Sequence, residues 1–455
     1  MKLPAGPQTP PFLQLIQWIA SPLELLETSA QRYGDCFTLR LSGLSPLVIL
    51  SSPQAIEEIF TANPEQFEVG RANGILRPLL GEKSMMLMDG DRHQSQRRLL
   101  TPPFHGDRMR SYGKLICDIS EQVISQWAIS EPFSVRSSMQ EISLRVILQA
   151  VFGLNEGQRC EQLKQLLRSV LDVTGSPLRS SLLFFKSLQR DLGPWSPWGR
   201  FLRQKQQIDQ LINAEIQERR EQADLSRADI LALLMSARDE NDQPMTDAEL
   251  RDELMTLLVA GHETTASALS WALYWIHHLP EVHDRLLKEL DPVVDQADLS
   301  AIAKLPYLSA VCQETLRIYP IAMLALPRIA KSPRQLTGYQ FEADTWLVPC
   351  IYLTHHREDL YPEPKRFKPE RFLERQFSAY EYLPFGGSNR RCIGMAFAML
   401  EMKLVLATVL SRYNLAIADN GAVRPVRRGL TLAPSVGKWL VATSQRQNAN
   451  IPVLL

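Results

Sequence analysis

The segment of this 455-residue chain that is best suited to chemistry is a glycine-rich loop containing a cysteine. It runs Pro384-Phe-Gly-Gly-Ser-Asn-Arg-Arg-Cys-Ile-Gly394 and precedes a helix expected to begin near Met395. A cysteine just before a helix N-terminus lies at the positive end of the helix dipole, which favours the thiolate. The glycines let the backbone approach a flat cofactor, and Arg390 can reach an anionic group at the cofactor's edge. Taken alone, the loop predicts either an activated thiolate beside a cofactor or a glycine turn with an incidental cysteine.

A second unusual segment lies in the middle of the longest expected helix. Thr246 and Glu249 form a capping-box pattern, and helical periodicity continues to Leu279 before Pro280, which gives a helix of roughly 50 Å. Its centre reads Ala260-Gly-His-Glu-Thr-Thr265, where glycine and threonine are poor helix formers. Such a conflict between local propensity and the expected element often marks a functional site. The small residues predict a groove beside this helix, and a threonine hydroxyl there can bond to a helix carbonyl or to water.

Two further motifs follow the long helix. Glu314 and Arg317 in Glu314-Thr-Leu-Arg317 lie on one helix face and can form an ion pair. Taken alone, this would be an exposed pair that stabilises the fold little. Pro369-Glu-Arg-Phe372 then supplies another arginine, Arg371, which can join the pair.

Along the chain, the four motifs follow one another in the order long-helix centre, Glu314–Arg317, Pro369–Phe372 and cysteine loop. In this order they resemble the motifs of the cytochrome P450 family, in particular its bacterial-type members. The ligand signature of that family is Phe-Gly-x-Gly-x-Arg-x-Cys-x-Gly. This chain matches it at Phe385, Gly386, Arg390, Cys392 and Gly394. Ser388 stands where the family usually has glycine, which concerns the conformation of the loop. The resemblance implies that Cys392 is the axial thiolate ligand of haem b, iron protoporphyrin IX.

The resemblance implies a catalytic role for the centre of the long helix. In the family an acid–alcohol pair delivers protons during O₂ activation, and Glu263 and Thr264 match that pair. Ala260 is expected to lie beside the haem. His262 is expected to belong to the hydrogen-bond network of the helix and not to bind a metal, because Cys392 already accounts for the iron.

Other residues are implied to hold the haem and the cysteine loop. His93 and Arg97 are four residues apart and share a helix face. The haem propionates are expected to be bound by His93, Arg97, Arg328 and Arg390. A buried network behind the haem is expected from Glu314, Arg317 and Arg371.

The implied reaction is a monooxygenation, of the class of oxidoreductases that act on paired donors. A proximal thiolate pushes electron density onto haem iron and favours O–O cleavage. The chain shows no Gly-x-Gly-x-x-Gly dinucleotide fingerprint, so a separate ferredoxin or flavodoxin with its reductase is expected to supply electrons. A basic cluster near the cysteine side is either a docking surface for this acidic partner or simply a solvated surface: Lys365, Arg366, Lys368, Arg375 and Arg391.

The substrate is expected to be apolar, such as a fatty acid or a terpenoid. The segments expected to face it are rich in Ile, Leu, Met and Ala. The pocket candidates are Leu257, Gly261, Ile321, Leu324, Leu430 and Leu432. Two alternatives to a monooxygenase are a haem-thiolate enzyme that does not use O₂, namely a peroxygenase or hydroperoxide isomerase, and a non-catalytic haem sensor or electron carrier. The Glu263–Thr264 pair argues against both.

Composition restricts the partners and the compartment. Lys plus Arg and Asp plus Glu each count 50, which argues against a nucleic-acid partner. The six cysteines form no Cys-x-x-Cys pair, which is typical of a reducing compartment. No stretch reaches the ~20 apolar residues needed to span a bilayer. We therefore expect a soluble, cytoplasmic monomer, in which the segment Phe12 to Leu26 either packs on the protein or rests on a membrane surface.

The fold that positions these residues is expected to be mainly α, a single cytochrome P450 domain with small β-sheets segregated to one side of a helix-rich part. Residues 56–319 and 393–411 should form the helical part, with the long helix at its centre. Residues 1–55, 320–384 and 412–455 should contribute the β-rich part. Strands are expected at 36–41 and 46–51, which should pair as a hairpin, and in the tail at 414–418, 429–433 and 438–443.

Overall fold

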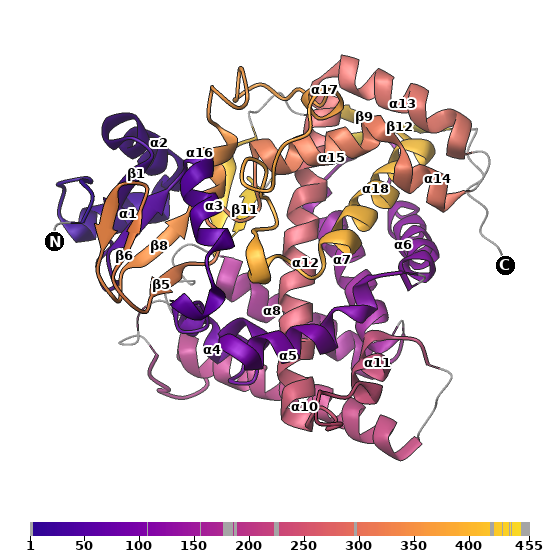
Figure 1. The fold of residues 1–455 in the computed structure, drawn as a ribbon. Helices are drawn as coiled ribbons and strands as arrows, with labels where there is room; N and C mark the ends of the chain where they lie inside the picture. The colour runs from indigo at the N-terminus through magenta and orange to yellow at the C-terminus, as the bar shows by residue number, and fades with distance from the viewer. Residues whose placement is uncertain are drawn as a thin grey trace.

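The computed structural model describes residues 3–446 except for short gaps at 107, 155, 176–184, 186–188, 223–226, 295–297, 419–422, 430, 436 and 438. Helices dominate it, as the sequence predicts (Figure 1). The longer helices are α3 (Pro53–Thr61), α5 (Gly90–Leu100), α6 (Arg108–Ile124), α7 (Val135–Phe152), α8 (Gln158–Gly175), α10 (Pro197–Gln222), α12 (Asp247–His278), α13 (Pro280–Val294), α15 (Pro306–Ile318) and α18 (Met395–Arg412). Shorter helices are α4 (Arg77–Leu80), α11 (Ile230–Ser236), α14 (Leu299–Lys304), α16 (Ile351–His355) and α17 (Arg371–Glu374).

Helix α12 runs through the middle of the molecule (Figure 1). It begins where the sequence predicts, because Thr246 accepts a hydrogen bond from the backbone of Glu249 while the Glu249 carboxylate accepts one from the backbone of Thr246. It ends at His278, and Pro280 starts α13. Helices α7, α15 and α18 pack against it, so its centre is enclosed by protein on several sides.

The largest sheet has five strands in the order β1-β2-β8-β5-β3. Their bounds are β1 (Cys36–Leu39), β2 (Leu47–Leu50), β8 (Trp346–Pro349), β5 (Arg328–Ala330) and β3 (Phe67–Glu68). Strands β1 and β2 pair antiparallel, from Cys36 opposite Leu50 to Leu39 opposite Leu47, which confirms the predicted hairpin. Strand β2 then pairs parallel with β8, so the start of the chain and residues 320–384 share one sheet.

Three smaller sheets complete the β structure. They pair β6 (Arg334–Leu336) with β7 (Tyr339–Phe341), β10 (Pro425–Arg428) with β11 (Thr431–Pro434), and β12 (Leu440–Gln445) with both β4 (Pro132–Phe133) and β9 (Tyr413–Ile417). The tail differs from expectation in one respect. Tyr413, Leu440 and Ala442 are buried in the hydrophobic cluster of the helices, so β9 and β12 pack on the helical part and not on the five-stranded sheet.

The N-terminal segment forms two helices, α1 (Pro11–Ala20) and α2 (Pro22–Tyr33), that lie beside the five-stranded sheet (Figure 1). Trp18, Leu25 and Leu26 are buried in one hydrophobic cluster with Phe37 and Leu39 of β1. This part of the segment from Phe12 to Leu26 therefore packs on the protein. Phe12 and Ile16 of α1 are exposed.

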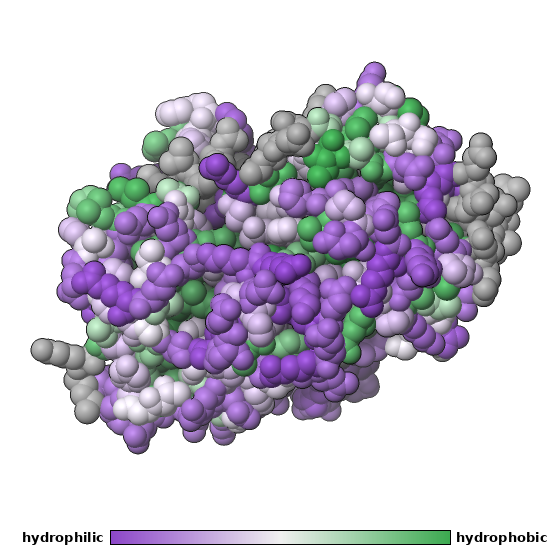
Figure 2. Space-filling model, turned by 90° about the horizontal axis from the view of Figure 1, so that it is seen from above, coloured by the Kyte–Doolittle hydropathy of each residue, from purple (hydrophilic) through white to green (hydrophobic). Residues whose placement is uncertain are grey.

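The surface is mostly polar, with small scattered apolar areas, on the face seen in Figure 2. Among the described residues, no helix combines the length and the apolar character needed to cross a bilayer.

Candidate active site

The cysteine loop is held in a tight turn by its own backbone. Cys392 donates its N–H to the carbonyl of Phe385 at 3.0 Å, which closes the loop ahead of α18. Gly386 has a φ of 67°, a conformation that glycine adopts without strain. Ser388 has a φ of 60°. The position at which the chain departs from the family signature is therefore one that favours glycine, and the serine adopts the glycine conformation at a cost of about 1 kcal/mol.

Close packing leaves no room for a side chain at the second glycine. A Cβ at Gly387 would lie 2.3 Å from a ring carbon of Phe60, a residue of α3. The half-buried Phe385 packs against the hydrophobic cluster of the helices. The loop is thus fixed from both sides, and Cys392 has a defined position before α18.

The protonation of the Cys392 sulfur is influenced by several neighbouring groups. The cysteine residue is exposed, yet the protein around its sulfur raises the pKa of the thiol by desolvation. The Gly394 N–H, the Arg97 guanidinium and Arg391 act in the opposite direction. An exposed cysteine residue whose sulfur is surrounded by protein fits the wall of a cofactor pocket. A Cβ at Gly394 would lie 4.0 Å from the sulfur, an ordinary van der Waals distance.

The predicted propionate ligands are brought together from three parts of the chain. His93 and Arg97 come from α5, Arg328 from β5 and Arg390 from the loop. Burial, Arg390, Arg97 and Arg328 lower the pKa of His93 to about 3, which keeps its imidazole neutral. The Nδ1 atom of His93 is buried and has no hydrogen-bond partner among the described residues.

The charges of this cluster are unbalanced. Arg390 donates to the Asp89 carboxylate at 2.7 Å and to the Met88 carbonyl. Burial lowers the pKa of both Arg328 and Arg390 to about 10, while Asp89 acts in the opposite direction on both groups. Three guanidinium groups, those of Arg97, Arg328 and Arg390, lower the pKa of His93. Against these three cations, the carboxylate of Asp89 raises this pKa and pairs with Arg390. The cluster therefore fits a dianionic group such as the propionates of haem.

Asp89 was not predicted from the sequence. It also accepts hydrogen bonds from the backbone of Val69 and Gly70, at 2.9 and 3.0 Å, and so ties this loop to Arg390. A signal was present, because Asp89 directly precedes the helix that carries His93 and Arg97.

The acid and the alcohol predicted at the centre of α12 form hydrogen bonds with different partners. Thr264 donates its hydroxyl to the carbonyl of Ala260 at 2.6 Å. Glu263 accepts hydrogen bonds from Arg136 and, at 2.9 Å, from Gln140 of α7. Ala260 is exposed although most of this helix is buried. Neither Arg136 nor Gln140 was predicted from the sequence, since no local pattern connects them to Glu263.

Two other residues of this turn have structural environments. His262 is buried, and burial together with Arg136 and Arg168 lowers its pKa to about 3. Gly261 meets α7, because a Cβ there would lie 2.9 Å from Ile147. Its small size therefore permits close helix packing, whereas the sequence suggested that it widens a pocket.

The structure brings Glu314, Arg317 and Arg371 together in a buried network. Arg317 donates to both carboxylate oxygens of Glu314, at 2.6 and 2.9 Å, and both side chains have no exposed surface. Arg371 donates to Glu314 at 3.1 Å. Arg317 also donates to the carbonyl of His355 at 2.8 Å, which links the network to the β-rich part.

The pocket candidates lie in different environments. Leu257 and Ile321 are buried in the cluster of the helices, and Leu324 is partly buried against the cluster of the five-stranded sheet. Leu432 has no exposed surface and belongs to the core of that sheet cluster, so it does not face an open space. Its backbone N–H donates to Ile321 at 2.8 Å, which brings these two segments side by side. Leu430 lies outside the described residues.

The basic cluster near the loop is largely neutralised by neighbouring carboxylates. Ion pairs join Lys365 to Glu27, Arg366 to Glu363 and Arg375 to Glu381. Arg391 is exposed directly beside Cys392. The positive surface is thus smaller than the sequence suggested.

Comparison with known proteins identifies this arrangement. A family model described as "Cytochrome P450" matches residues 4–441. The putative cytochrome P450 135B1 of Mycobacterium tuberculosis is 38% identical over 96% of this chain and 90% of its own length. The putative cytochrome P450 135A1 of the same organism is 32% identical over 98% and 96%. A solved structure, the retinoic acid-bound cyanobacterial CYP120A1, has a TM-score of 0.79 and 25% identity, and it covers 96% of this chain and 100% of its own.

These matches extend over nearly the whole chain and agree with the helix-rich fold. Members of the matched family are monooxygenases that bind haem through a cysteine thiolate. The chain belongs to the cytochrome P450 family.

Proposed function

We propose that Cys392 is the thiolate that binds the haem iron and that the protein oxygenates an apolar substrate, such as a fatty acid or a terpenoid. The assignment rests on one observation, the cluster of basic side chains and Asp89 beside the cysteine loop. The basic side chains are His93, Arg97, Arg328 and Arg390, and the cluster has an excess of positive charge. One nitrogen of His93 has no hydrogen-bond partner among the described residues. When bound, the haem supplies the oxidation chemistry. The residues of the chain bind it, exclude water and move protons.

The turn from Ala260 to Thr264 is the candidate site of proton delivery. We assign the Thr264 hydroxyl, which donates to the Ala260 carbonyl, the role of holding a water molecule beside the exposed Ala260. Glu263 would supply protons to that water from its site beside Arg136 and Gln140.

The substrate class is supported by the apolar character of the pocket candidates, of which Leu257 and Ile321 belong to the hydrophobic cluster of the helices. The structural neighbour is described as bound to retinoic acid, an apolar carboxylic acid. A substrate with a long apolar body agrees with both observations.

The electron donor is proposed to be a ferredoxin or flavodoxin with its reductase. Arg391 is exposed next to Cys392 and adds a positive charge to the surface beside the cysteine loop, which favours an acidic partner. Free cysteines throughout the described residues agree with a cytoplasmic location, and we propose that the protein acts there as a monomer.

The assignment is tested by the absorption spectrum of the reduced, CO-bound protein. A Soret band at the thiolate position is expected for the wild type and its loss is expected for Cys392→Ser. Titration with lauric and retinoic acids should then shift the ferric Soret band. A wild-type band at the position of imidazole-ligated haem would contradict the role of Cys392.

Turnover separates the proposal from the alternative of a haem-thiolate peroxygenase or isomerase. With ferredoxin, reductase and O₂, the wild type should form product, and Thr264→Ala should divert most of the consumed electrons to peroxide. Product formation with hydrogen peroxide and none with the electron-transfer proteins would favour the alternative.

A further inference from the structure

The chain between α4 and α5 supplies the acceptors that orient Arg390 of the cysteine loop. Arg390 donates from Nη1 to the Met85 carbonyl at 3.4 Å and from Nη2 to the Met88 carbonyl. Nη2 also donates to the Asp89 carboxylate at 2.7 Å. The Nε atom is buried and has no hydrogen-bond partner among the described residues. Because a guanidinium group is planar and rigid, the acceptors of Nη1 and Nη2 determine the direction in which the Nε–H points.

The same chain segment is attached to α12 by a buried carboxyl group. Glu253 accepts the Met85 N–H at 2.6 Å and is 1% exposed. Met85 therefore connects two parts of the molecule, because its N–H is bound to α12 and its carbonyl accepts Arg390. Water does not screen a hydrogen bond in such a buried place, so the position of Met85 depends strongly on Glu253.

A pair of hydroxyl groups adds a second attachment to α12. The hydroxyl oxygens of Ser84 and Thr256 lie 2.8 Å apart, and both residues are buried. Thr256 donates its single proton to the Asp252 carbonyl at 2.7 Å, so Ser84 is the donor between the two hydroxyls. The Ser84 oxygen in turn accepts the Met86 N–H at 3.2 Å, which caps the 3₁₀ turn Met85–Leu87. The side chain of Thr256 thus fixes the start of this turn.

The chain just before the turn is also held on α12. The carboxylate of Asp252 accepts the Lys83 N–H at 2.8 Å and the Arg251 Nε–H at 2.8 Å. Gly81 lies so close to this carboxylate that a Cβ would be 2.2 Å from its carbon atom. The approach of the chain to α12 is therefore tight, and the charge of Asp252 is balanced.

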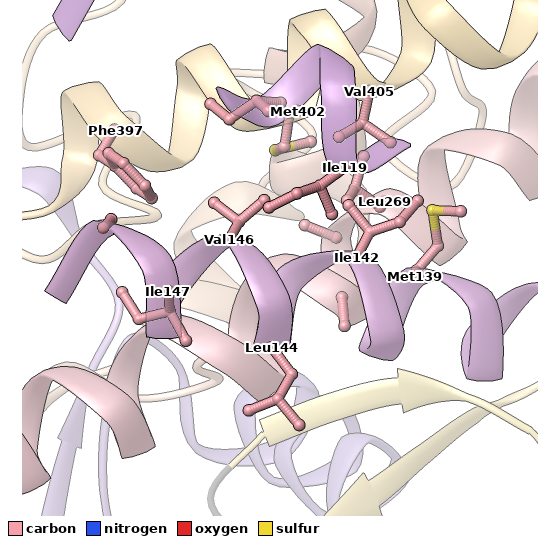
Figure 3. Packing of buried hydrophobic residues seen from close by; sticks show 14 of the residues in the cluster. Ile119, Met139, Ile142, Leu144, Val146, Ile147, Leu269, Phe397, Met402 and Val405 are labelled. Atoms are coloured by element: carbon pink, nitrogen blue, oxygen red, sulfur yellow. The ribbon is translucent and has the colours of Figure 1, made fainter. Parts of the chain in front are cut away.

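Helix α12 is a rigid support for these contacts, because its further course lies in the core. Leu269 of α12 lies beside Met139 and Ile142 of α7 in the hydrophobic cluster of the helices (Figure 3). The Ala260–Thr264 turn begins four residues after Thr256, which is about one helical turn. One helix therefore carries the proton-delivery turn and holds the chain segment that orients Arg390.

We propose that Glu253, together with Thr256, is a positioning residue of the haem site, which acts through Met85 to direct the Nε–H of Arg390 toward a haem propionate. Without the Glu253 acceptor, the turn that contains Met85 moves, and Arg390 keeps only Asp89. The guanidinium group then turns away from the propionate. This consequence rests on the propionate role of Arg390 in the proposed function, whereas the hydrogen bonds between α12 and the turn do not.

The experiment compares haem-loaded variants at neutral pH and needs no substrate. Glu253→Leu removes the acceptor of the Met85 N–H, and Thr256→Val removes the acceptor of the Ser84 proton. The rate of haem transfer to apomyoglobin and the midpoint potential of the haem are measured. The reduced CO spectrum checks that each variant is loaded.

Two further variants serve as controls. Glu253→Gln keeps an oxygen that can accept the N–H, and it changes the charge little at neutral pH, since burial raises the pKa of Glu253 to about 8. Ser270→Ala removes a buried hydroxyl of α12 that donates to the Ala266 carbonyl of the same helix at 2.7 Å. Both controls should keep the wild-type rate and potential.

Glu253→Leu and Thr256→Val should each speed haem transfer roughly tenfold, the factor that corresponds to one lost buried hydrogen bond. Both should also lower the midpoint potential, because a cation that moves away from the haem no longer favours its reduced form. Wild-type rates and potentials in both variants overturn the positioning role. Thr256→Val decides alone if Glu253→Leu does not fold.

Arg390→Gln separates an action through Arg390 from a general loosening of the fold. This variant should itself speed haem transfer, and the addition of Glu253→Leu or Thr256→Val should then change the rate and the potential little further, because residues that act through one another are not additive. Fully additive effects overturn the proposal. A wild-type rate and potential in Arg390→Gln would overturn it at the propionate role of Arg390 and not at the contacts with α12.

Discussion

The carboxylate of Glu263 is bound by the guanidinium group of Arg136, which comes from the neighbouring helix α7. The Arg136 side chain is 8% exposed and that of Glu263 is 15% exposed, so water screens this pair only weakly. The candidate catalytic acid, Glu263, is therefore held in an ion pair within the Ala260–Thr264 turn. Its availability depends on a residue 127 positions away in the sequence.

Replacement of Arg136 by methionine should destabilise the protein. The variant leaves the Glu263 carboxylate without its cation, at a cost of about 3 kcal/mol. The double variant Arg136→Met, Glu263→Gln should recover most of this loss, because no unpaired charge remains. Urea unfolding followed by circular dichroism measures both. Equal stabilities of the single and double variants would contradict the importance of the pair.

Ser388→Gly should stabilise the cysteine loop. The serine has a φ of 60°, and glycine adopts this conformation without the penalty of about 1 kcal/mol. The midpoint of haem loss in guanidinium chloride should therefore move to higher denaturant concentration. Gly387→Ala, one residue earlier, should abolish haem binding, since its Cβ would overlap the ring of Phe60 at 2.3 Å. If Ser388→Gly lost haem at a lower guanidinium chloride concentration than the wild type, the proposed strain at Ser388 would be refuted.

Arg317→Met should prevent haem incorporation. Glu314, which has no exposed surface, would lose the arginine that binds both of its carboxylate oxygens and keep only a single hydrogen bond from a cationic side chain, that of Arg371, at a cost of about 3 kcal/mol. The amplitude of the reduced CO spectrum per protein measures the loss. Arg285→Met is the matched control, because Arg285 pairs with Glu370 at 2.8 Å on the surface and this pair should contribute less than about 1 kcal/mol. Similar spectra for the two variants would contradict the structural role of the buried network.

Glu253→Gln should stabilise the protein at alkaline pH. Burial raises the pKa of Glu253 to about 8, and its carboxyl accepts the Met85 N–H at 2.6 Å. A carboxyl whose pKa is raised in the folded state favours folding while it is protonated, and that contribution is lost as the pH rises toward 8. The urea midpoint of the wild type should thus fall more than that of the variant as the pH rises from the ordinary carboxyl pKa of 4.5 to about 8. Glu240→Gln, at an exposed position, should keep the wild-type slope, and parallel slopes for all three proteins would exclude this titration.

The sequence by itself determined the family and the main chemical groups. The cysteine loop, the Glu314–Arg317 motif and the turn at Ala260–Thr264 are each contained within about a dozen consecutive residues, so their geometry follows from local structure. The long helix was predicted with its cap because a capping box is a local signal. The positive φ of Ser388 also agrees with the glycine of the family signature at that position.

The tertiary structure alone decided which partners these groups have. Asp89 reaches Arg390 across 301 positions, and Arg136 reaches Glu263 across 127. Such contacts depend on how helices pack and on the absence of a side chain at Gly261. No periodicity in one segment encodes them, because the energy of a buried charge depends on the groups that the whole fold places around it.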